Sequence, residues 1–353
     1  MTRIVITQPY IANYRANFYE LLNSRLKKMG KELVVIESIN LKDHERRGDK
    51  VELNYAIKKK ELRLNFFGIS FYYRLGVKIN KHDVIVTEFS ATNLNLWKWI
   101  LTFKKDNVYL WGQVLPQSTR RGQLDFLLEK FLAKKCKGIF AYTDSGRRVL
   151  ISNGISASKI FVVENSTDTN LILKLKKNLS KKAIEKIASN RGIDKSKSNF
   201  LFLGSLTRIK GLDFLYDFAK LVSKNNSDIR IIVGGSGHIG EFFPDTINFK
   251  KLGRVEGEDL VAITSVCRAL IIPGAIGLVA VDALALGKTV ITRENQKHGP
   301  EIEYLASEGM VIELSEDVSE FYQQFIKLNF RTKRIQKLPS IEKMVSNFLT
   351  GLY

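Results

Sequence analysis

A glycine-rich turn in the second half of the chain could cradle a phosphate. The segment IIVGGSGHIG leads from a strand-like run at 231–233 into Gly235-x-Gly237-x-x-Gly240, which has the spacing of a dinucleotide-binding loop. Such a loop also requires a sizeable helix after it and an acidic residue about 20 positions further on. Pro244 interrupts the following segment, and another strand-like run comes soon after it. We therefore interpret the glycines as a turn after a strand, with NAD binding as an alternative.

The segment 271–292 has the features of a second anion site. A buried strand and a tight turn precede a helix of small residues that is expected to begin at about Gly277. The backbone N–H groups of Gly277, Leu278 and Val279 would lack acceptors within that helix, and the helix dipole would also favour a diphosphate there. Asp282 lies one turn further and could accept hydrogen bonds from two ribose hydroxyls. Alternatively, water caps the helix and Asp282 is solvated.

Two cations follow the strand that ends at Gly204. The polar loop after this strand contains Ser205, Arg208 and Lys210, and Gly211 then allows the turn into a helix. Cations at the carboxyl end of a strand are well placed to neutralise a diphosphate leaving group. The alternative is a basic surface loop.

Strand-like and helix-like segments alternate along the chain and must position these residues. Strands are predicted at about 3–7, 32–37, 84–86, 108–111, 138–142, 160–163, 199–203, 229–233, 249–252, 269–272, 289–292 and 311–313. Helices are predicted at about 13–28, 93–102, 124–134, 145–153, 179–190, 212–223, 260–265, 277–286, 302–306, 317–329 and 340–353. This alternation predicts an α/β fold with two parallel-sheet, doubly wound domains that meet near residue 168, and ligands would bind at the carboxyl ends of their strands.

Charge and composition limit the classes of partner. The net charge of +20 favours anionic partners such as acidic lipid or phosphorylated substrates, although a solvated basic surface is the alternative. No nucleic-acid-binding signature occurs, so no nucleic acid partner is expected. Cys136 and Cys267 lie in apolar surroundings, which indicates reduced thiols and a cytoplasmic location. No run approaches the roughly 18 to 20 apolar residues of a membrane span, and no Cys/His cluster has metal-ligand spacing.

The ordered motifs of the second half resemble the family-4 glycosyltransferases of GT-B architecture. That family has a strand-Gly-Arg-Leu-x-x-x-Lys-Gly segment, then strand-Gly-x-Gly, then a Glu-x7-Glu element. The corresponding segments here are Gly204-Ser-Leu206-Thr-Arg208-Ile-Lys210-Gly211, Gly235-Ser-Gly237 and Gly274-Ala-Ile-Gly277-Leu-Val-Ala-Val-Asp282-Ala283. By this resemblance, the glycine-rich turn lies beneath a sugar nucleotide and does not bind NAD.

Other segments resemble a subgroup of the family that acts in bacterial surface-polysaccharide assembly. They are Gln8-Pro9-Tyr10-x4-Arg15-x2-Phe18, Leu110-Trp111-Gly112-Gln113, Asn165-Ser166-Thr167-Asp168 and the Lys297-His298-Gly299-Pro300-Glu301 loop. The resemblance implies a GT-B fold with an acceptor-side domain at 1–168, a nucleotide-sugar-binding domain at 169–338 and a C-terminal helix at 339–353 that returns to the first domain.

The sequence also departs from the family pattern at several positions. Gly274 stands where the family has its first Glu, and Asp282 shortens the second. Ser205 replaces an Arg after the strand glycine, and Gln113 replaces a His. A second hypothesis is therefore a GT-B-like binding or scaffold protein, without catalysis, that has a degenerate donor site.

The resemblance implies retaining transfer from a nucleotide sugar, with UDP or GDP as the carrier and with no cofactor or metal required. The implied catalytic residues are Lys210, Arg208 and Asp282. The implied donor-binding residues are Gly204, Ser205, Gly235, Gly237, Arg254, Val255, Gly277, Leu278, Val279, His298 and Glu301. The implied acceptor-side residues are Tyr14, Arg15 and Gln113, although Tyr14 could instead pack in the core.

The same resemblance implies a lipid-linked glycan acceptor, as in lipopolysaccharide O-antigen or capsule biosynthesis. A basic first domain would then dock on the inner face of the cytoplasmic membrane. The candidate contacts are Lys58, Lys59 and Lys60 with Phe66, Phe67, Phe71, Tyr72 and Tyr73, and the alternative for these aromatic residues is ordinary core packing.

Overall fold

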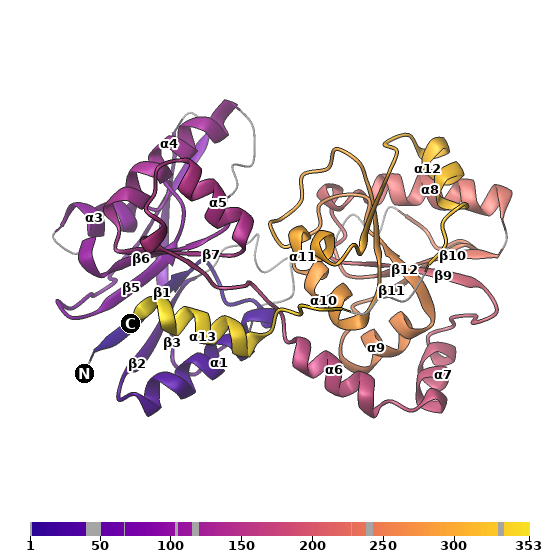
Figure 1. The fold of residues 1–353 in the computed structure, drawn as a ribbon, viewed down its shortest axis with the longest axis horizontal. Coiled ribbons are helices and arrows are strands. Elements are labelled where there is room, and N and C mark those ends of the chain that lie inside the picture. The colour runs from indigo at the N-terminus through magenta and orange to yellow at the C-terminus, as the bar shows by residue number, and fades with distance from the viewer. Residues whose placement is uncertain are drawn as a thin grey trace. The chain divides into compact units, whose positions relative to one another are not determined.

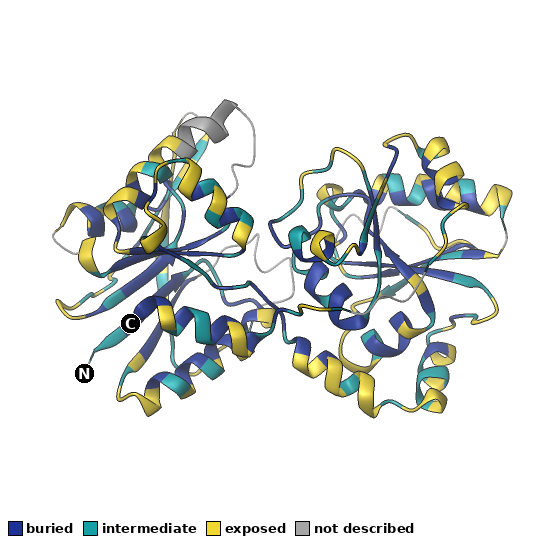
Figure 2. Ribbon diagram, in the orientation of Figure 1, coloured by how far each residue is buried: buried dark blue, intermediate teal, exposed yellow. Residues whose placement is uncertain are grey.

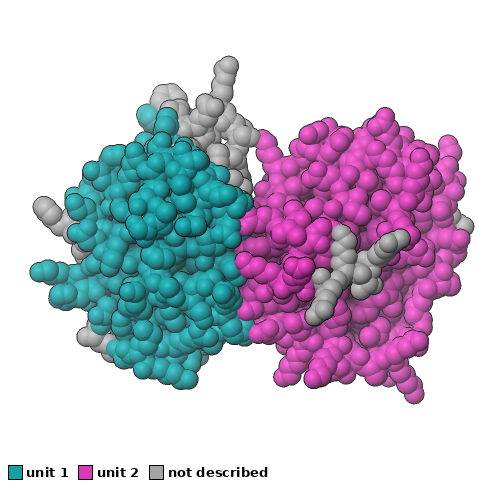
Figure 3. All heavy atoms as spheres, in the orientation of Figure 1, with its two compact units in different colours: residues 1–165, 341–353 teal, residues 166–340 magenta. Residues whose placement is uncertain are grey.

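The chain folds into two compact units. The computed structural model describes residues 2–39, 51–66, 68–102, 105–114, 120–226, 228–237, 243–330 and 335–353. Unit 1 contains residues 1–165 together with 341–353, and unit 2 contains residues 166–340 (Figure 3). The chain therefore leaves unit 1 once and returns to it for its last helix.

Unit 1 is built on a largely parallel sheet. Its strands are β1 (Arg3–Gln8), β2 (Glu32–Ile39), β3 (Ala56–Phe66), β4 (Ile69–Arg74), β5 (Val84–Glu88), β6 (Val108–Gly112), β7 (Gly138–Ala141) and β8 (Ile160–Val162). Its helices are α1 (Asn13–Lys28), α3 (Leu94–Leu101), α4 (Arg120–Lys135), α5 (Asp144–Ser152) and α13 (Ile341–Leu352). The strand order is β4-β3-β2-β1-β5-β6-β7-β8, and each pairing is parallel except that of β3 with β4.

Helices cover both faces of this sheet, as Figure 1 shows. On one face, α1 packs on β2 and against α13, and α13 packs on β7 and β8, where Phe348 stacks on Phe140 with ring centroids 4.2 Å apart. On the other face, α3, α4 and α5 cover a second cluster that includes Leu96, Leu132 and Leu150. Figure 2 shows the strands largely buried and the exposed residues on the outer sides of the helices.

The hairpin β3–β4 was missed by the sequence analysis, which assigned no strand between residues 38 and 83. The run Lys58, Lys59 and Lys60 hid β3 because charged residues are unfavourable in a strand with two covered faces. Most of β3 is exposed, so lysines are tolerated there. The prediction that strands and helices alternate without interruption was therefore wrong at this edge of the sheet.

Unit 2 has a fully parallel sheet in the described residues. Its strands are β9 (Ser198–Leu203), β10 (Ile229–Gly234), β11 (Phe249–Gly253), β12 (Cys267–Ile271), β13 (Val290–Arg293) and β14 (Val311–Leu314). Its helices are α6 (Thr169–Asn178), α7 (Lys181–Asn190), α8 (Leu212–Asn225), α9 (Gly257–Ser265), α10 (Val279–Leu286), α11 (Ile302–Ser307) and α12 (Val318–Phe325). The order β11-β10-β9-β12-β13-β14 is that of a Rossmann-like sheet.

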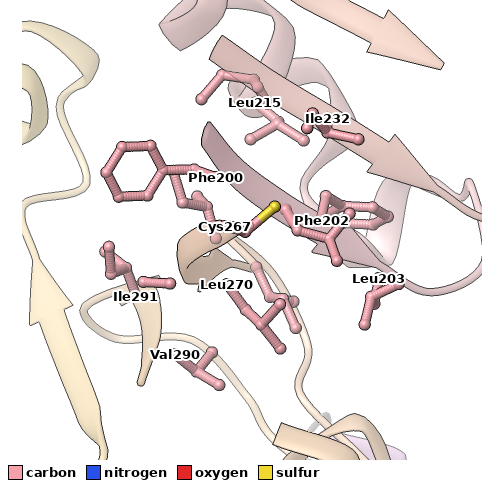
Figure 4. Close-up of a cluster of buried hydrophobic side chains, with 14 of the residues drawn as sticks. Phe200, Phe202, Leu203, Leu215, Ile232, Cys267, Leu270, Val290 and Ile291 are labelled. Carbon is pink, nitrogen blue, oxygen red and sulfur yellow. The ribbon is translucent and has the colours of Figure 1, made fainter. Parts of the chain in front are cut away.

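The core of unit 2 lies between its strands and the helices on either face. Figure 4 shows part of it, where Phe200 and Phe202 of β9 gather with Cys267 and Leu270 of β12 and with Ile291 of β13. Figure 1 shows α8 and α12 on one side of the sheet and α9 on the other. The predicted fold class, α/β with two Rossmann-like parallel-sheet domains, is confirmed.

Two helix predictions in unit 2 need correction. The single helix predicted at 179–190 is preceded by another, α6, and the two are separated at Leu179–Ser180, where Ser180 caps α7 by accepting from the Ala183 N–H. The helix predicted from Gly277 begins as α10 at Val279. The mixture of lysines with apolar residues masked the first boundary.

We predict that Phe348→Ala destabilises unit 1 by about 3–5 kcal/mol, because it removes a fully buried ring that stacks on Phe140. Tyr353→Ala, which alters an exposed aromatic residue of the same C-terminal segment, should cost less than about 1 kcal/mol. Denaturant unfolding followed by tryptophan fluorescence measures both. Equal effects of the two variants would show that α13 adds little to the stability of unit 1.

Candidate functional site

The topology of unit 2 brings the two predicted anion-binding loops together. Strand order reverses between β9 and β12, which are neighbours, and ligands of Rossmann-like sheets bind at such a reversal. The loop after β9 contains 204–211, and the turn after β12 contains 272–278. Both loops leave the carboxyl ends of adjacent strands, so they meet at one edge of the sheet.

The two loops cross in direct backbone contact. The Gly274 N–H donates to the Lys210 carbonyl oxygen (3.1 Å), and the Ala275 N–H donates to the Ile209 carbonyl oxygen (2.8 Å). A Cβ atom on Gly274 would overlap the backbone of residues 209–211, and one on Gly211 would lie 2.9 Å from the Gly274 nitrogen. Gly211 also has a φ of +73°. Only glycine at both positions permits this crossing.

A glycine at 274 is therefore a steric requirement of this chain. The sequence analysis noted Gly274 only as the loss of a carboxylate, because the packing of the neighbouring loop cannot be read from the sequence. The same crossing leaves no room for the family's Glu unless the 209–211 backbone moves.

The turn at Gly235 and Gly237 serves a similar packing purpose. The Leu206 N–H donates to the Ser236 carbonyl oxygen (2.9 Å), which holds this turn against the end of β9. A Cβ atom at Gly235 would overlap the Gly204 carbonyl oxygen, and one at Gly237 would lie 2.5 Å from the Leu206 carbonyl oxygen. The third glycine of the spacing, Gly240, lies outside the described residues.

Lys210 is the best-placed cation of the site. Its ammonium donates to the Ala275 carbonyl oxygen (2.6 Å), so the side chain reaches from the loop after β9 to the turn after β12. Burial lowers the pKa of Lys210, and the nearby Glu301 carboxylate opposes that shift. Arg208, two residues earlier, is exposed, as is Ser205.

His298 and Glu301 lie in the loop after β13, the next strand of the sheet. The His298 Nδ1 accepts from the Ile276 N–H (3.1 Å), which fixes the neutral ring with its proton on Nε2. Burial and then the charge of Lys210 lower the pKa of His298. Its Nε2 is buried and has no hydrogen-bond partner among the described residues. Glu301 is buried with 4% of its surface exposed.

Asp282 lies in the first turn of α10. Its Oδ1 accepts from the Thr167 hydroxyl (2.6 Å), and burial raises its pKa to about 6 although this hydrogen bond opposes the shift. The N–H groups of Gly277, Leu278 and Val279, at the start of α10, donate to no acceptor within the described part of the chain. Thr167 was quoted in the sequence analysis as part of a motif, but its contact with Asp282 was not anticipated.

Arg254 and Val255 follow β11, which is separated from β12 in the sheet by the two strands β10 and β9. Val255 is buried against Gly234, so its side chain belongs to the core and only its backbone could edge a base. Arg254 forms an ion pair with Glu256 at 2.7 Å. These two residues therefore lie farther from the β9–β12 reversal than the other predicted donor-side residues.

The predicted acceptor-side residues of unit 1 have different environments. Tyr14 is 41% exposed, so its alternative interpretation as a core residue was wrong. Arg15 is buried and donates to the Asn165 Oδ1 (2.5 Å), with its guanidinium 4.8 Å from the Trp111 ring centroid. Gln113 follows β6 and is partly exposed. Arg15 thus connects α1 to the carboxyl end of β6 and to the segment after β8.

A buried polar network in unit 1 was not predicted. Arg74 donates to Glu88 (2.5 Å) and to the Ser38 hydroxyl (2.8 Å), and it lies 3.6 Å from Glu61. Glu88 ends β5, beside β1 at the strand-order reversal of this sheet. An acidic residue at the end of a buried strand is the signal that could have identified it.

Neither a metal cluster nor a membrane span is found where the structure is described. No group of three or more His, Cys, Asp or Glu side chains there could hold a metal ion. Within the same residues, no helix combines the length and the apolar character needed to cross a bilayer.

Comparison with known proteins agrees with this geometry. Residues 197–329, which lie within unit 2, match the family model described as "Glycosyl transferases group 1". An uncharacterized 41.2 kDa protein in the cps region of Klebsiella pneumoniae is 28% identical over 247 residues. That match covers 67% of this chain and 66% of the relative, slightly less than two thirds of its length.

Solved structures share the fold over nearly the whole chain. A glycosyltransferase from Rickettsia africae has a TM-score of 0.64 at 14% identity, covering 99% of this chain and 97% of that one. UDP-GlcNAc 2-epimerase from Neisseria meningitidis, bound to UDP-GlcNAc, has a TM-score of 0.66 at 12% identity, covering 100% and 99%. The glycosyltransferase resemblance and the GT-B fold class are therefore confirmed.

We predict that Gly274→Ala destabilises unit 2 by about 1–3 kcal/mol, because the new methyl group must push the 209–211 backbone away. Gly277→Ala is the matched control, since a Cβ atom there meets nothing within 4 Å, and it should change stability by less than about 0.5 kcal/mol. Thermal unfolding measures both. Wild-type stability of Gly274→Ala would contradict the proposed requirement for glycine.

We predict that Asp282→Asn stabilises the protein at neutral pH. The folded-state pKa of about 6 lies above the ordinary value of 3.8, so folding favours the protonated carboxyl. This stabilisation is complete below about pH 4 and is lost as pH rises through about 6, leaving a cost on the order of 3 kcal/mol for the carboxylate. The amide variant avoids that cost, and its oxygen can still accept from Thr167.

The measurement is the difference in unfolding temperature between Asp282→Asn and the wild type from about pH 4 to about pH 8. The difference should be near zero at the acidic end and positive at the alkaline end. A difference that does not change with pH, or that favours the wild type at neutral pH, would contradict the raised pKa of Asp282.

Proposed function

We propose that this protein is a retaining glycosyltransferase. It would move a sugar from a UDP- or GDP-linked donor to a lipid-linked glycan acceptor in surface-polysaccharide biosynthesis, as in O-antigen or capsule assembly. The group 1 glycosyl transferase domain at 197–329 and the cps-region relative support this class of reaction.

The environment of Lys210 is the observation that carries the proposal. Its ammonium is desolvated at the strand-order reversal, and no carboxylate forms an ion pair with it among the described residues. A partly buried cation without a carboxylate partner is stabilised when an anion joins it, and a diphosphate would supply that charge. The free N–H groups before α10 and the unpartnered Nε2 of His298 belong to adjoining loops and also suit an anionic, polar ligand.

In the proposed reaction, the bond between the anomeric carbon and the β-phosphate oxygen breaks, and its electron pair stays on that oxygen. Lys210 and the exposed Arg208 neutralise the developing charge, while the N–H groups of Leu278 and Val279 hold the diphosphate. Asp282 accepts from the ribose hydroxyls. An acceptor hydroxyl attacks the anomeric carbon from the face the diphosphate leaves, and its proton passes to the departing phosphate.

A protein of the same fold supports one choice of nucleotide. The Neisseria meningitidis epimerase that shares the fold is bound to UDP-GlcNAc, which supports a UDP-linked donor ahead of a GDP-linked one. The charge neutralisation assigned to Lys210 and Arg208 requires no metal ion. A lipid-linked acceptor places the protein at the inner face of the cytoplasmic membrane.

A second candidate function is a binding or scaffold protein without catalysis. The packing at Gly274 favours it, because the family's first Glu has no space there. The two candidates differ in one measurable property: only the transferase consumes the donor.

We predict that UDP raises the unfolding temperature of the wild type and that Lys210→Ala removes this shift, because the variant lacks the buried charge that meets the diphosphate. Lys220→Ala is the control, since this exposed lysine of α8 forms a surface ion pair with Asp217 and lies over the Tyr216 ring. GDP, ADP and NAD are the competing ligands. A shift with NAD alone would overturn the transferase proposal.

Donor turnover separates the transferase from the scaffold. Release of UDP from UDP-sugars should be detectable with the wild type and should fall at least about 100-fold in Lys210→Ala. Binding of UDP without turnover of any nucleotide sugar, in the presence of lipid-linked glycan extracts, would favour the scaffold. Gly274→Glu should lower the unfolding temperature and should not raise turnover.

A further inference from the structure

The outer part of the β3–β4 hairpin extends past the end of its neighbouring strand. β2 pairs with β3 only from Val35–Ala56 to Ile39–Lys60. Beyond that point, residues 61–66 of β3 pair with β4 alone. In this outer part of the hairpin, the two faces have different surroundings.

The inner end of one face of the hairpin packs in the interior of unit 1. Glu61 and Arg74 are opposite each other in the register, and both side chains are almost fully buried in the Glu88 network. Tyr72 lies on the same face. Its backbone N–H donates to the Thr92 carbonyl oxygen (3.0 Å), so it is not available to pair with another strand. The inner end of this face and the strand edge at Tyr72 are therefore occupied.

The other face presents apolar side chains to solvent. Leu62, Leu64 and Phe66 alternate along β3 and are 44%, 62% and 65% exposed. The antiparallel register places Tyr73, Phe71 and Ile69 directly opposite them, so all six side chains share this face. Apolar residues gathered in this way on a soluble surface usually mark a binding surface.

The charges on this face are positive. Lys58 and Lys60 precede Leu62 on the same side of β3 and are exposed, and the Lys98 ammonium lies 3.2 Å from the Tyr73 hydroxyl. Lys58 also contacts Glu52. The hairpin's own acidic residue, Glu61, is buried on the opposite face. The result is an apolar strip with cations at one end, which we call the hairpin face.

We propose that the hairpin face docks on the surface of an anionic lipid bilayer. Exposed Leu and Phe side chains would enter the boundary between headgroups and acyl chains, Tyr73 would lie at the headgroup level, and the lysines would contact acidic headgroups. A second copy of the chain is a poorer occupant, because it would bring the same lysines against each other. This inference rests on the proposed function only in that a lipid-linked acceptor would give the docking its purpose.

The test is co-sedimentation of the full chain with vesicles of phosphatidylcholine alone or mixed with phosphatidylglycerol. The wild type should bind the anionic vesicles more tightly, and added salt should weaken that binding. The double variants Leu64→Ser/Phe66→Ser and Lys58→Ala/Lys60→Ala should each lower the affinity for anionic vesicles at least about tenfold. Each side chain is expected to raise that affinity by on the order of a few-fold, and the two losses multiply. All four side chains are exposed, so the fold should survive, and an unchanged unfolding temperature checks this.

The matched controls are Ile247→Ser and Lys220→Ala/Lys224→Ala, which alter exposed residues of unit 2 and should bind vesicles as the wild type does. Equal loss in the controls, or no loss in the hairpin variants, would overturn the proposal. So would conversion of a dimer to a monomer by Leu64→Ser/Phe66→Ser, since the hairpin face would then join two copies.

The outcome is separable from that of the proposed function. The hairpin variants should keep the UDP-dependent rise in unfolding temperature, because no donor-side residue is altered. Vesicle binding through the hairpin face without any nucleotide shift would refute the transferase while supporting the docking surface. A UDP-dependent rise in unfolding temperature without vesicle binding would support the transferase and refute the docking surface.

Discussion

Backbone-to-backbone contact at one edge of the unit 2 sheet is the constraint on which the candidate site depends. Gly274 and Gly211 allow the turn after β12 to cross the loop after β9, and Gly235 and Gly237 press the next turn against that same loop. Any side chain at these positions would separate the segments. The close approach lets the Lys210 ammonium reach the Ala275 carbonyl oxygen, so a cation becomes partly buried at the reversal of strand order.

The electrostatics of the site follow from this packing. Burial lowers the pKa values of Lys210 and His298 and raises that of Asp282, and in each case the charged form is the one that burial opposes. Titratable groups held in this condition are typical of functional sites, because a ligand of opposite charge or a hydrogen-bonding ligand relieves the cost. The same packing explains why a glycine occupies the position of the family's first Glu.

Unit 1 has a different organisation at its own strand-order reversal. There Arg74 pairs with Glu88 and lies near Glu61, and Arg15 lies among aromatic rings and donates to Asn165. These contacts hold the charged side chains in defined positions, and the Arg74–Glu61 contact places the inner end of one face of the β3–β4 hairpin in the interior. The opposite face of that hairpin is left with exposed apolar side chains and lysines.

The sequence by itself determined the α/β class, the two Rossmann-like units and most strand and helix positions, because alternating apolar runs and glycine turns are local signals. It also identified the loops of Lys210 and Asp282, since both follow buried strands. Only the tertiary structure decided that Gly274 is required by packing, that Thr167 meets Asp282, and that Arg74 and Glu88 form a buried pair. These contacts join residues far apart in the chain, and their energies depend on burial and distance, which no local pattern encodes.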